Sequence, residues 1–202
     1  MFSINYRLSG EHGTIPAGWG KTLSSVYPAT RDAKAAVRWM RDRAHIYSLD
    51  TERITALGSS AGALVTLALG TVDEGDYRDE LSLEDDWTLA TTNLEQSSRV
   101  ATVIDQWGTL SAVTRLEELS PGDRIDSGDA PVLIIHGTED GLVLFSRGLE
   151  VQAAFTAVGV PVELQPIDGA GHSPFSARLN DGRPQTEAML EFMVEHQQLD
   201  LR

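Results

Sequence analysis

Apolar runs and amphipathic stretches alternate along the chain, and the two patterns predict strands and helices in turn. Short apolar runs between Gly, Pro or charged residues predict strands, and apolar positions three or four apart predict helices. The predicted strands are residues 2–8, 53–58, 100–108, 130–137 and 161–167, and the predicted helices are residues 30–44, 61–70, 145–159 and 184–199. This alternation favours an α/β fold: an open, mostly parallel sheet of about five strands with helices on both faces.

The first two predicted helices differ in polarity. The helix over residues 30–44 has one apolar face, formed by Ala33, Ala36, Val37, Met40 and Ala44. Its basic residues lie mostly off that face: Arg31, Lys34, Arg38 and Arg41. The helix over residues 61–70, "AGALVTLALG", is apolar on all sides and is therefore expected at the centre of the molecule.

Residues 71–99 interrupt the alternation with a polar, strongly acidic segment that contains "DEGDYRDELSLEDD". Acidic runs of this kind are usually solvated, so we expect an insertion or a flexible lid rather than a specific cation site. The chain has 202 residues, a length that suits one core. We therefore predict a single domain over residues 1–202 with residues 71–99 as an excursion from it.

The charge of the chain narrows its partners. It carries 30 acidic and 16 basic residues, a net charge of −14, which repels polyanions and predicts no nucleic-acid partner. Cysteine is absent, so thiolate nucleophiles and thiolate metal sites are excluded. No apolar run reaches the roughly 18 residues of a membrane span, and "MFSINYRLSG" lacks the features of a secretion signal. We expect a soluble protein, in the cytoplasm rather than secreted.

A candidate nucleophile lies between the second predicted strand and the apolar helix. Ser60 stands in "GSSAG", residues 58–62, which fits the pattern G-x-S-x-G. In that pattern the serine occupies a strained turn, and the flanking glycines let the strand and helix approach closely. The turn also directs a helix N-terminus at the reacting atoms. Taken alone, the motif fits a small-residue packing junction equally well, and Ser59 is out of register.

The base and acid that a nucleophilic serine needs follow later in the chain. Asp140 comes just after the predicted strand 130–137, in "HGTEDG", and His172 lies in the glycine-rich loop "DGAGH" after the next strand. The carboxyl ends of parallel strands meet at one edge of the sheet, where open α/β folds place their sites. The order Ser60, Asp140, His172 therefore predicts a catalytic triad.

Other residues compete for these roles. Glu139 and Asp105 are alternative acids, and His136 is expected to organise the turn before Asp140 rather than to transfer protons. Trp107 either walls a substrate pocket or packs in the core. The remaining histidines, His12, His45 and His196, have no partners at metal-ligand spacing, so we expect neither a metal nor an organic cofactor.

The sequence as a whole resembles the α/β-hydrolase superfamily, and within it bacterial esterases of the hormone-sensitive-lipase-like and polysaccharide-ester-cleaving groups. The similar pieces run in order through nearly the whole chain: "INYRL", "DAKAAVRWMRDRA", "LDTERITALGSSAGA", "SSRVATVIDQWG", "VLIIHGTEDGLV" and "DGAGHSPF". The resemblance implies Ser60 as nucleophile, Asp140 as acid and His172 as base. It also implies the backbone N–H of Ala61 as one donor of the oxyanion hole.

The resemblance departs at the front of the chain. In these esterases some eighty residues precede the "YRL" strand and include a His-Gly-Gly-Gly-like oxyanion loop, whereas this chain has no Gly-Gly pair. The chain thus resembles the carboxyl-terminal two-thirds of such an enzyme. The loop "LSGEHGTIPAGWG", residues 8–20, is a substitute source of an N–H group. An unprotected strand at residues 2–8 would favour a homodimer through that strand.

The function that these features favour is hydrolysis of small, short-acyl carboxylic esters through an acyl-enzyme, without a cofactor. Two alternatives remain open. One is a non-catalytic or weakly active, truncated hydrolase-like domain that serves binding or assembly. The other is a peptidase or thioesterase, because a triad alone does not distinguish amide, thioester and ester.

Overall fold

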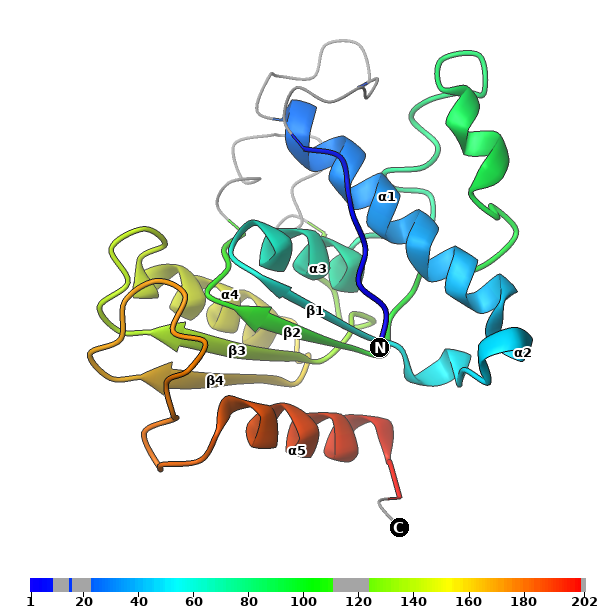
Figure 1. Cartoon of the computed structure of the whole chain (residues 1–202). Coiled ribbons are helices and arrows are strands. Elements are labelled where there is room, and N and C mark those ends of the chain that lie inside the picture. The colour runs from blue at the N-terminus through cyan, green and yellow to red at the C-terminus, as the bar shows by residue number, and fades with distance from the viewer. Residues whose placement is uncertain (9–14, 16–22, 111–123, 201–202) are drawn as a thin grey trace.

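The computed structural model of the chain describes residues 1–8, 15, 23–110 and 124–200, and in them a parallel sheet lies between layers of helices (Figure 1). The four strands are β1 (Thr55–Ser59), β2 (Thr102–Gln106), β3 (Val132–Gly137) and β4 (Val162–Ile167). The α-helices are α1 (Leu23–Asp42), α2 (Ala44–Tyr47), α3 (Ala61–Thr71), α4 (Phe145–Ala157) and α5 (Gln185–Gln197), with short 3-10 helices at Thr51–Arg53 and Trp87–Thr91.

The strands pair in the order β1-β2-β3-β4, and every pair is parallel. All residues of β2 and β3 are buried, as expected for central parallel strands covered on both faces. The predicted α/β fold is confirmed. Because all four strands run in one direction, their carboxyl ends, and the loops that follow them, share one edge of the sheet.

Alternate residues of the strands build two separate cores. On one face Val132 and Ile134 of β3 pack with Leu67 of α3 and Phe155 of α4. On the other face the neighbouring positions of β3 pack with α5 through Met189 and other apolar side chains. Figure 1 shows α1, α3 and α4 over one face of the sheet and α5 over the other. The apolar pattern of α3 is thereby explained, since α1 covers its outer side.

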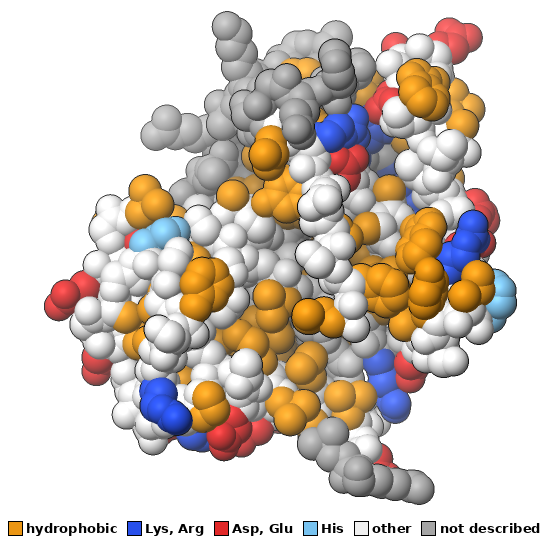
Figure 2. Space-filling view, viewed as in Figure 1, with side chains coloured by type: hydrophobic (Ala, Val, Ile, Leu, Met, Phe, Trp, Pro, Cys, Tyr) orange, Lys and Arg blue, Asp and Glu red, His pale blue; other side chains and the backbone are white. Residues whose placement is uncertain are grey.

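The strand predicted at residues 2–8 does not form, so the described sheet has four strands rather than about five. This segment runs along α1, beside the outer edge of β1 but without pairing with it (Figure 1). The Arg7 backbone N–H and guanidinium both donate to the Asp32 carboxylate, over 2.8 and 2.7 Å. Figure 2 shows hydrophobic side chains gathered on this face of the molecule; those exposed near the segment are Phe2, Ile4, Trp39 and Tyr47. Contacts with α1 thus hold residues 2–8 in place, and this segment does not pair as a strand.

The basic side of α1 is buried, which the sequence did not indicate. The Lys34 ammonium donates to the backbone carbonyls of Asp73 and Asp76, over 2.6 and 2.7 Å, and Arg31 pairs with Asp86 over 2.8 Å. Burial lowers the pKa of Lys34 to about 8. The acidic segment over residues 71–99 therefore packs on α1 instead of standing free in solvent, because it supplies the carbonyls and carboxylates that these cations need.

Among the described residues, no helix combines the length and apolar character that crossing a membrane requires.

Candidate active site

The turn between β1 and α3 holds Ser60 in a strained conformation. Its φ of 53° and ψ of −117° are unusual for a residue with a side chain. The turn is tight because a β-carbon on Gly58 would lie 2.3 Å from the carbonyl oxygen of Gly62. The Ser60 N–H donates to the carbonyl of Gln106 over 2.9 Å, which fixes the turn to the end of β2. The G-x-S-x-G pattern thus forms the sharp strand-to-helix turn that it predicts.

Asp140 lies in the loop after β3 and is 3% exposed. One carboxylate oxygen accepts the backbone N–H groups of Leu142 and Val143, over 2.8 and 2.9 Å. Burial acts to raise the pKa of Asp140. The hydrogen bonds from His172, Leu142 and Val143 outweigh it and hold the pKa below its usual value. Asp140 is therefore ionised at neutral pH.

His172 lies in the loop after β4 and bridges the other two side chains. Its Nδ1 atom is 2.7 Å from Oδ2 of Asp140, and its Nε2 atom is 3.1 Å from Oγ of Ser60. The loop is held close to β3, since a β-carbon on Gly137 would lie 2.3 Å from the carbonyl oxygen of Ala170. The structure thus brings together three side chains from three different loops.

The charge on Asp140 determines how this row of groups can act. An ionised carboxylate only accepts, so the imidazole nitrogen facing Asp140 carries the proton. The lone pair of Nε2 is then directed at Ser60, where it can accept the hydroxyl proton. The arrangement can therefore activate a serine oxygen as a nucleophile and hold the imidazolium that forms.

The competing acids lie elsewhere. In the described structure neither Glu139 nor Asp105 hydrogen-bonds to His172. Asp105 is fully buried and accepts the N–H of Gly108 over 2.8 Å, and burial raises its pKa to about 7. His136 contacts the carbonyl of Val143 through Nε2 at 2.8 Å, which fits the turn-organising role expected for it.

Trp107 packs under the site rather than in the pocket that opens at Ser60. Its side chain is fully buried, and its ring meets those of His172 and Phe175 edge-on, with centroids 6.4 and 4.7 Å apart. Trp107 is not among the described residues that line the pocket. Trp107 therefore packs in the core, with its ring against the imidazole of His172.

A largely apolar pocket of about 410 Å³ opens at Ser60. The described residues that line it beside Ser60 are Tyr6, Arg7, Leu8, Val26, Ala29, Ala61, Leu64, Val65, Thr109 and Val143. Ala61 is the first residue of α3, so its backbone N–H has no acceptor within the helix. This N–H and the positive end of α3 suit an oxyanion beside Ser60. The loop over residues 8–20 lies mostly outside the described residues.

A row of hydrogen-bonded polar side chains, which sequence reasoning missed, joins the Ser60 turn to the His172 loop. Ser59 Oγ donates to Gln106 over 2.9 Å, and Gln106 donates to Gln185 over 3.1 Å. Gln185 in turn donates to the carbonyl of Pro174 over 2.6 Å. The three side chains lie on β1, β2 and α5, so nothing in the spacing of the sequence signals that they meet.

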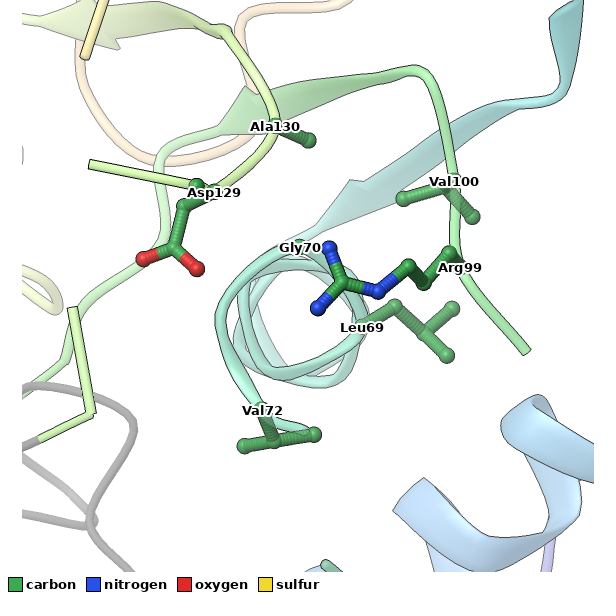
Figure 3. A pocket seen from close by; sticks show the side chains of 8 residues that line it. Leu69, Gly70, Val72, Arg99, Val100, Asp129 and Ala130 are labelled. Atoms are coloured by element: carbon green, nitrogen blue, oxygen red, sulfur yellow. The ribbon is translucent and has the colours of Figure 1, made fainter. Parts of the chain in front are cut away.

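A second cavity, of about 160 Å³, lies at the opposite end of α3 from Ser60. Figure 3 shows Arg99 and Asp129 on either side of the last turn of this helix, next to Gly70. Burial raises the pKa of Asp129 to about 6. Because α3 separates this cavity from Ser60, it is not part of the candidate site.

One cluster of metal-ligand types occurs among the residues that the structure describes. It consists of Glu163 on β4 with Glu195 and His196 on α5, whose ligand atoms lie within 4.8 Å of one another. Sequence spacing did not reveal Glu163 as a neighbour of His196, because the two belong to different elements. The cluster includes none of Ser60, Asp140 and His172, so the candidate active site is built without it.

The fold and the serine site together define an α/β-hydrolase-like protein. Residues 1–118 match the model of the BD-FAE family. Because this match covers more than half of the 202 residues, the chain belongs to the BD-FAE family.

Solved esterases share the fold. The structure of a thermophilic esterase from Thermogutta terrifontis with propionate bound is 26% identical, with a TM-score of 0.71; the match covers 98% of this chain and 72% of that one. The T. terrifontis esterase 2 phosphorylated by paraoxon is 27% identical, with a TM-score of 0.69 over 98% and 71% of the two chains. A truncated carbohydrate esterase from gut microbiota, 22% identical over 85% of this chain and 69% of that one, has the same fold with a TM-score of 0.67.

Curated relatives match a shorter stretch. The human alpha/beta hydrolase domain-containing protein 17B is 49% identical over 51 residues, 25% of this chain. The match covers 17% of the length of that relative. This likeness is therefore local, whereas the esterase structures match nearly the whole chain.

Proposed function

We propose that the chain is a serine carboxylesterase that hydrolyses small, short-acyl esters through an acyl-enzyme. The observation that carries this proposal is the position of His172, which lies within hydrogen-bonding distance of both Asp140 and Ser60. The apolar pocket of about 410 Å³ at Ser60 suits a small acyl or alcohol group. Propionate is bound in one structure of the T. terrifontis esterase.

In the first half of the reaction Ser60 attacks the ester carbonyl. His172 Nε2 takes the hydroxyl proton while Oγ bonds to the carbonyl carbon, and the negative charge moves to the carbonyl oxygen beside the Ala61 N–H. The tetrahedral intermediate then collapses. The bond to the alkoxy oxygen breaks, Nε2 returns its proton to that oxygen, and the alcohol leaves behind an acyl group on Ser60.

In the second half water replaces the alcohol. His172 Nε2 takes one proton from the water as its oxygen attacks the acyl carbon, and the proton then returns to Ser60 Oγ as the acid leaves. Asp140 keeps its negative charge throughout and stabilises the imidazolium without becoming protonated. No metal or organic cofactor takes part in these steps.

A panel of nitrophenyl esters from acetyl to dodecanoyl, assayed beside Ser60→Ala, tests this proposal. We expect the wild type to hydrolyse the short esters and Ser60→Ala to lose that activity. Fast hydrolysis of long-chain esters with none of acetate esters would contradict the substrate class. Equal activity of wild type and Ser60→Ala would remove Ser60 as nucleophile.

Two alternatives remain as outcomes of the same panel. A peptidase or thioesterase would cleave amides or thioesters faster than the matching oxygen esters. Matching amide and thioester substrates are therefore assayed beside the nitrophenyl esters. A non-catalytic domain for binding or assembly would show no hydrolysis and no labelling by a fluorophosphonate. The ionised acid and the aligned imidazole favour catalysis, because a binding surface needs neither.

Homodimer formation is a separate proposal. The dimer was expected through a strand at residues 2–8, and that strand does not form. We propose instead pairing through β1, an edge strand that pairs only with β2 among the described strands. Exposed apolar residues, Phe2, Ile4 and Leu57, lie near this edge. Light scattering tests the idea: a dimer at micromolar concentration supports it, and a monomer overturns it.

A further inference from the structure

We propose that the phenolic hydroxyl of Tyr6 is a second oxyanion donor, opposite the backbone N–H of Ala61. This inference rests on the proposed function and adds a catalytic residue to it. Among the described residues, the N–H of Ala61 is the backbone donor placed beside Ser60 above, and oxyanion holes ordinarily combine two or more donors. A described side chain that reaches the pocket at Ser60 can supply another donor.

The position of Tyr6 carries the argument. Tyr6 lines the pocket at Ser60 together with Ala61. It also lines a groove of about 730 Å³ along the outer edge of β1, together with Gly58, Ser59 and Gly62. The Tyr6 side chain therefore lies between the pocket at Ser60 and this groove. The hydroxyl oxygen lies 3.8 Å from the position that a β-carbon on Gly62 would occupy, at the amino end of α3.

The direction from which each group approaches the ester carbon also favours Tyr6. His172 reaches Ser60 from the loop after β4, across the sheet from the outer edge of β1. The base serves the attacking and leaving oxygens, so a donor to the carbonyl oxygen belongs on another side of the carbon. Tyr6 occupies the outer side of β1, where the groove runs. Besides Ser60 and Tyr6, the hydroxyl among the described residues of the pocket is that of Thr109, which follows β2, on the side of β1 toward β4.

Packing fixes the Tyr6 ring, and the Tyr6 hydroxyl is free to donate a hydrogen bond. Its ring packs against the apolar cluster that includes Ala33 and Val65, and the next residue, Arg7, is clamped to Asp32 by its backbone and guanidinium. No described residue receives a hydrogen bond from the Tyr6 hydroxyl, so its proton is free to turn toward an oxyanion.

Arg7 is the competing donor, and its geometry argues against it. It lines the same pocket, but Nε and Nη2 both donate to the Asp32 carboxylate, over 3.1 and 2.7 Å. Turning the guanidinium toward Ser60 would leave Asp32 without that pairing. A phenol needs no such rearrangement, because it is neutral and its hydroxyl can donate a hydrogen bond directly to the developing charge.

The test compares Tyr6→Phe with Tyr47→Phe. Both changes remove only a phenolic oxygen, and Tyr47 lies on the surface against Phe2, outside the pocket. We expect Tyr6→Phe to lower kcat for nitrophenyl acetate on the order of 10²–10³-fold with little change in KM, as for loss of one oxyanion donor. Tyr47→Phe keeps the wild-type kcat.

A second experiment retains the hydroxyl at position 6, so it gives a result even if Tyr6→Phe does not fold. Replacing Tyr6 by difluorotyrosine lowers the pKa of the phenol while preserving its shape. If the phenol donates a hydrogen bond to the oxyanion, activity is lost at lower pH than in wild type, because the ionised fluorinated phenol has no proton with which to donate. A role in packing alone leaves the pH profile unchanged and overturns the inference.

The outcomes separate the two proposals. Wild-type kcat in folded Tyr6→Phe, with activity abolished in Ser60→Ala, overturns the role of Tyr6 and leaves the serine esterase intact. No hydrolysis and no fluorophosphonate labelling of the wild type overturns both. Loss of kcat in Tyr6→Phe together with the shifted pH profile supports Tyr6 as the donor.

Discussion

The Nε2 atom of His172 lies 3.1 Å from Oγ of Ser60, although 112 residues separate them in the sequence. The sheet creates this contact. Ser60 follows β1 and His172 follows β4, at the two ends of a strand order whose strands all run in one direction. The loop of Asp140, after β3, holds the imidazole from its other side. The proposed chemistry follows from that alignment.

Asp140→Asn should lower kcat while leaving the fold intact. An amide carries no charge and allows the imidazole to place its proton on the nitrogen that faces Ser60, where it can no longer accept. The same change in serine proteases costs on the order of 10⁴-fold, and we expect a loss of about 10³–10⁴-fold in kcat for short esters.

Glu139→Gln is the matched control for this change. Glu139 precedes Asp140 in the same loop, is exposed, and forms no hydrogen bond to His172 in the described structure. The kcat of Glu139→Gln should therefore equal that of the wild type. A larger loss from Glu139→Gln than from Asp140→Asn would assign the acid to Glu139 instead.

Gly137→Ala should displace the His172 loop. A β-carbon there would lie 2.3 Å from the Ala170 carbonyl oxygen and 2.7 Å from that of Gly171, so the loop has to move. A shift of about 1 Å in a catalytic group costs on the order of 10² in rate. Gly141→Ala, in the loop after the same strand, has no atom within 4 Å of its β-carbon and should retain activity. Equal kcat values for both variants would contradict this account.

Ser60→Gly should be more stable than Ser60→Ala. The φ of 53° at this position is strained for any residue with a β-carbon, by about 1–3 kcal/mol, and glycine relieves that strain. Glycine also gains freedom in the unfolded chain, which offsets about 0.5–1 kcal/mol. Urea denaturation should give Ser60→Gly the larger free energy of unfolding. The reverse order would mean that the turn is relaxed.

Asp105 should make stability depend on pH. Burial raises its pKa to about 7 in the folded protein, whereas an aspartate in an unfolded chain titrates near 3.9. Between these values the folded state holds a proton that the unfolded state has released. The free energy of unfolding therefore falls as pH rises through this window, by about 1.4 kcal/mol for each pKa unit of difference.

Asp105→Asn isolates that effect, because asparagine does not ionise and still accepts the Gly108 N–H. We expect the variant to gain stability relative to wild type between about pH 4 and about pH 7, as measured by urea denaturation at each pH. A stability difference that stays constant with pH would show that Asp105 does not titrate in this range.

Much of the architecture could be predicted from sequence. The apolar runs over residues 130–137 and 61–70 lie at the centre as expected, because continuous apolar segments can be buried only between two layers. The proximity of Ser60, Asp140 and His172 could also be predicted, because parallel strands bring their following loops to one edge. Their catalytic roles stay predictions until activity is measured.

Other features depend on contacts that periodicity does not encode. Residues 2–8 have a strand-like pattern but bind α1, because the ion pair of Arg7 and Asp32 lies there. Lys34 lies off the apolar face of its helix, yet carbonyls from a segment about 40 residues later surround its ammonium. The hydrogen bond between Gln106 and Gln185 joins two positions that are 79 residues apart in the sequence. Such pairings arise only when distant elements meet.

The central claim, that Ser60 is the nucleophile of a serine hydrolase, is tested most directly by mass spectrometry of the protein treated with paraoxon, the reagent that phosphorylates T. terrifontis esterase 2. The account predicts that the wild type gains one diethylphosphoryl group, assigned to Ser60 by fragmentation of its peptide, and that Ser60→Ala gains none. An unmodified wild type, or the same modification in Ser60→Ala, would contradict it.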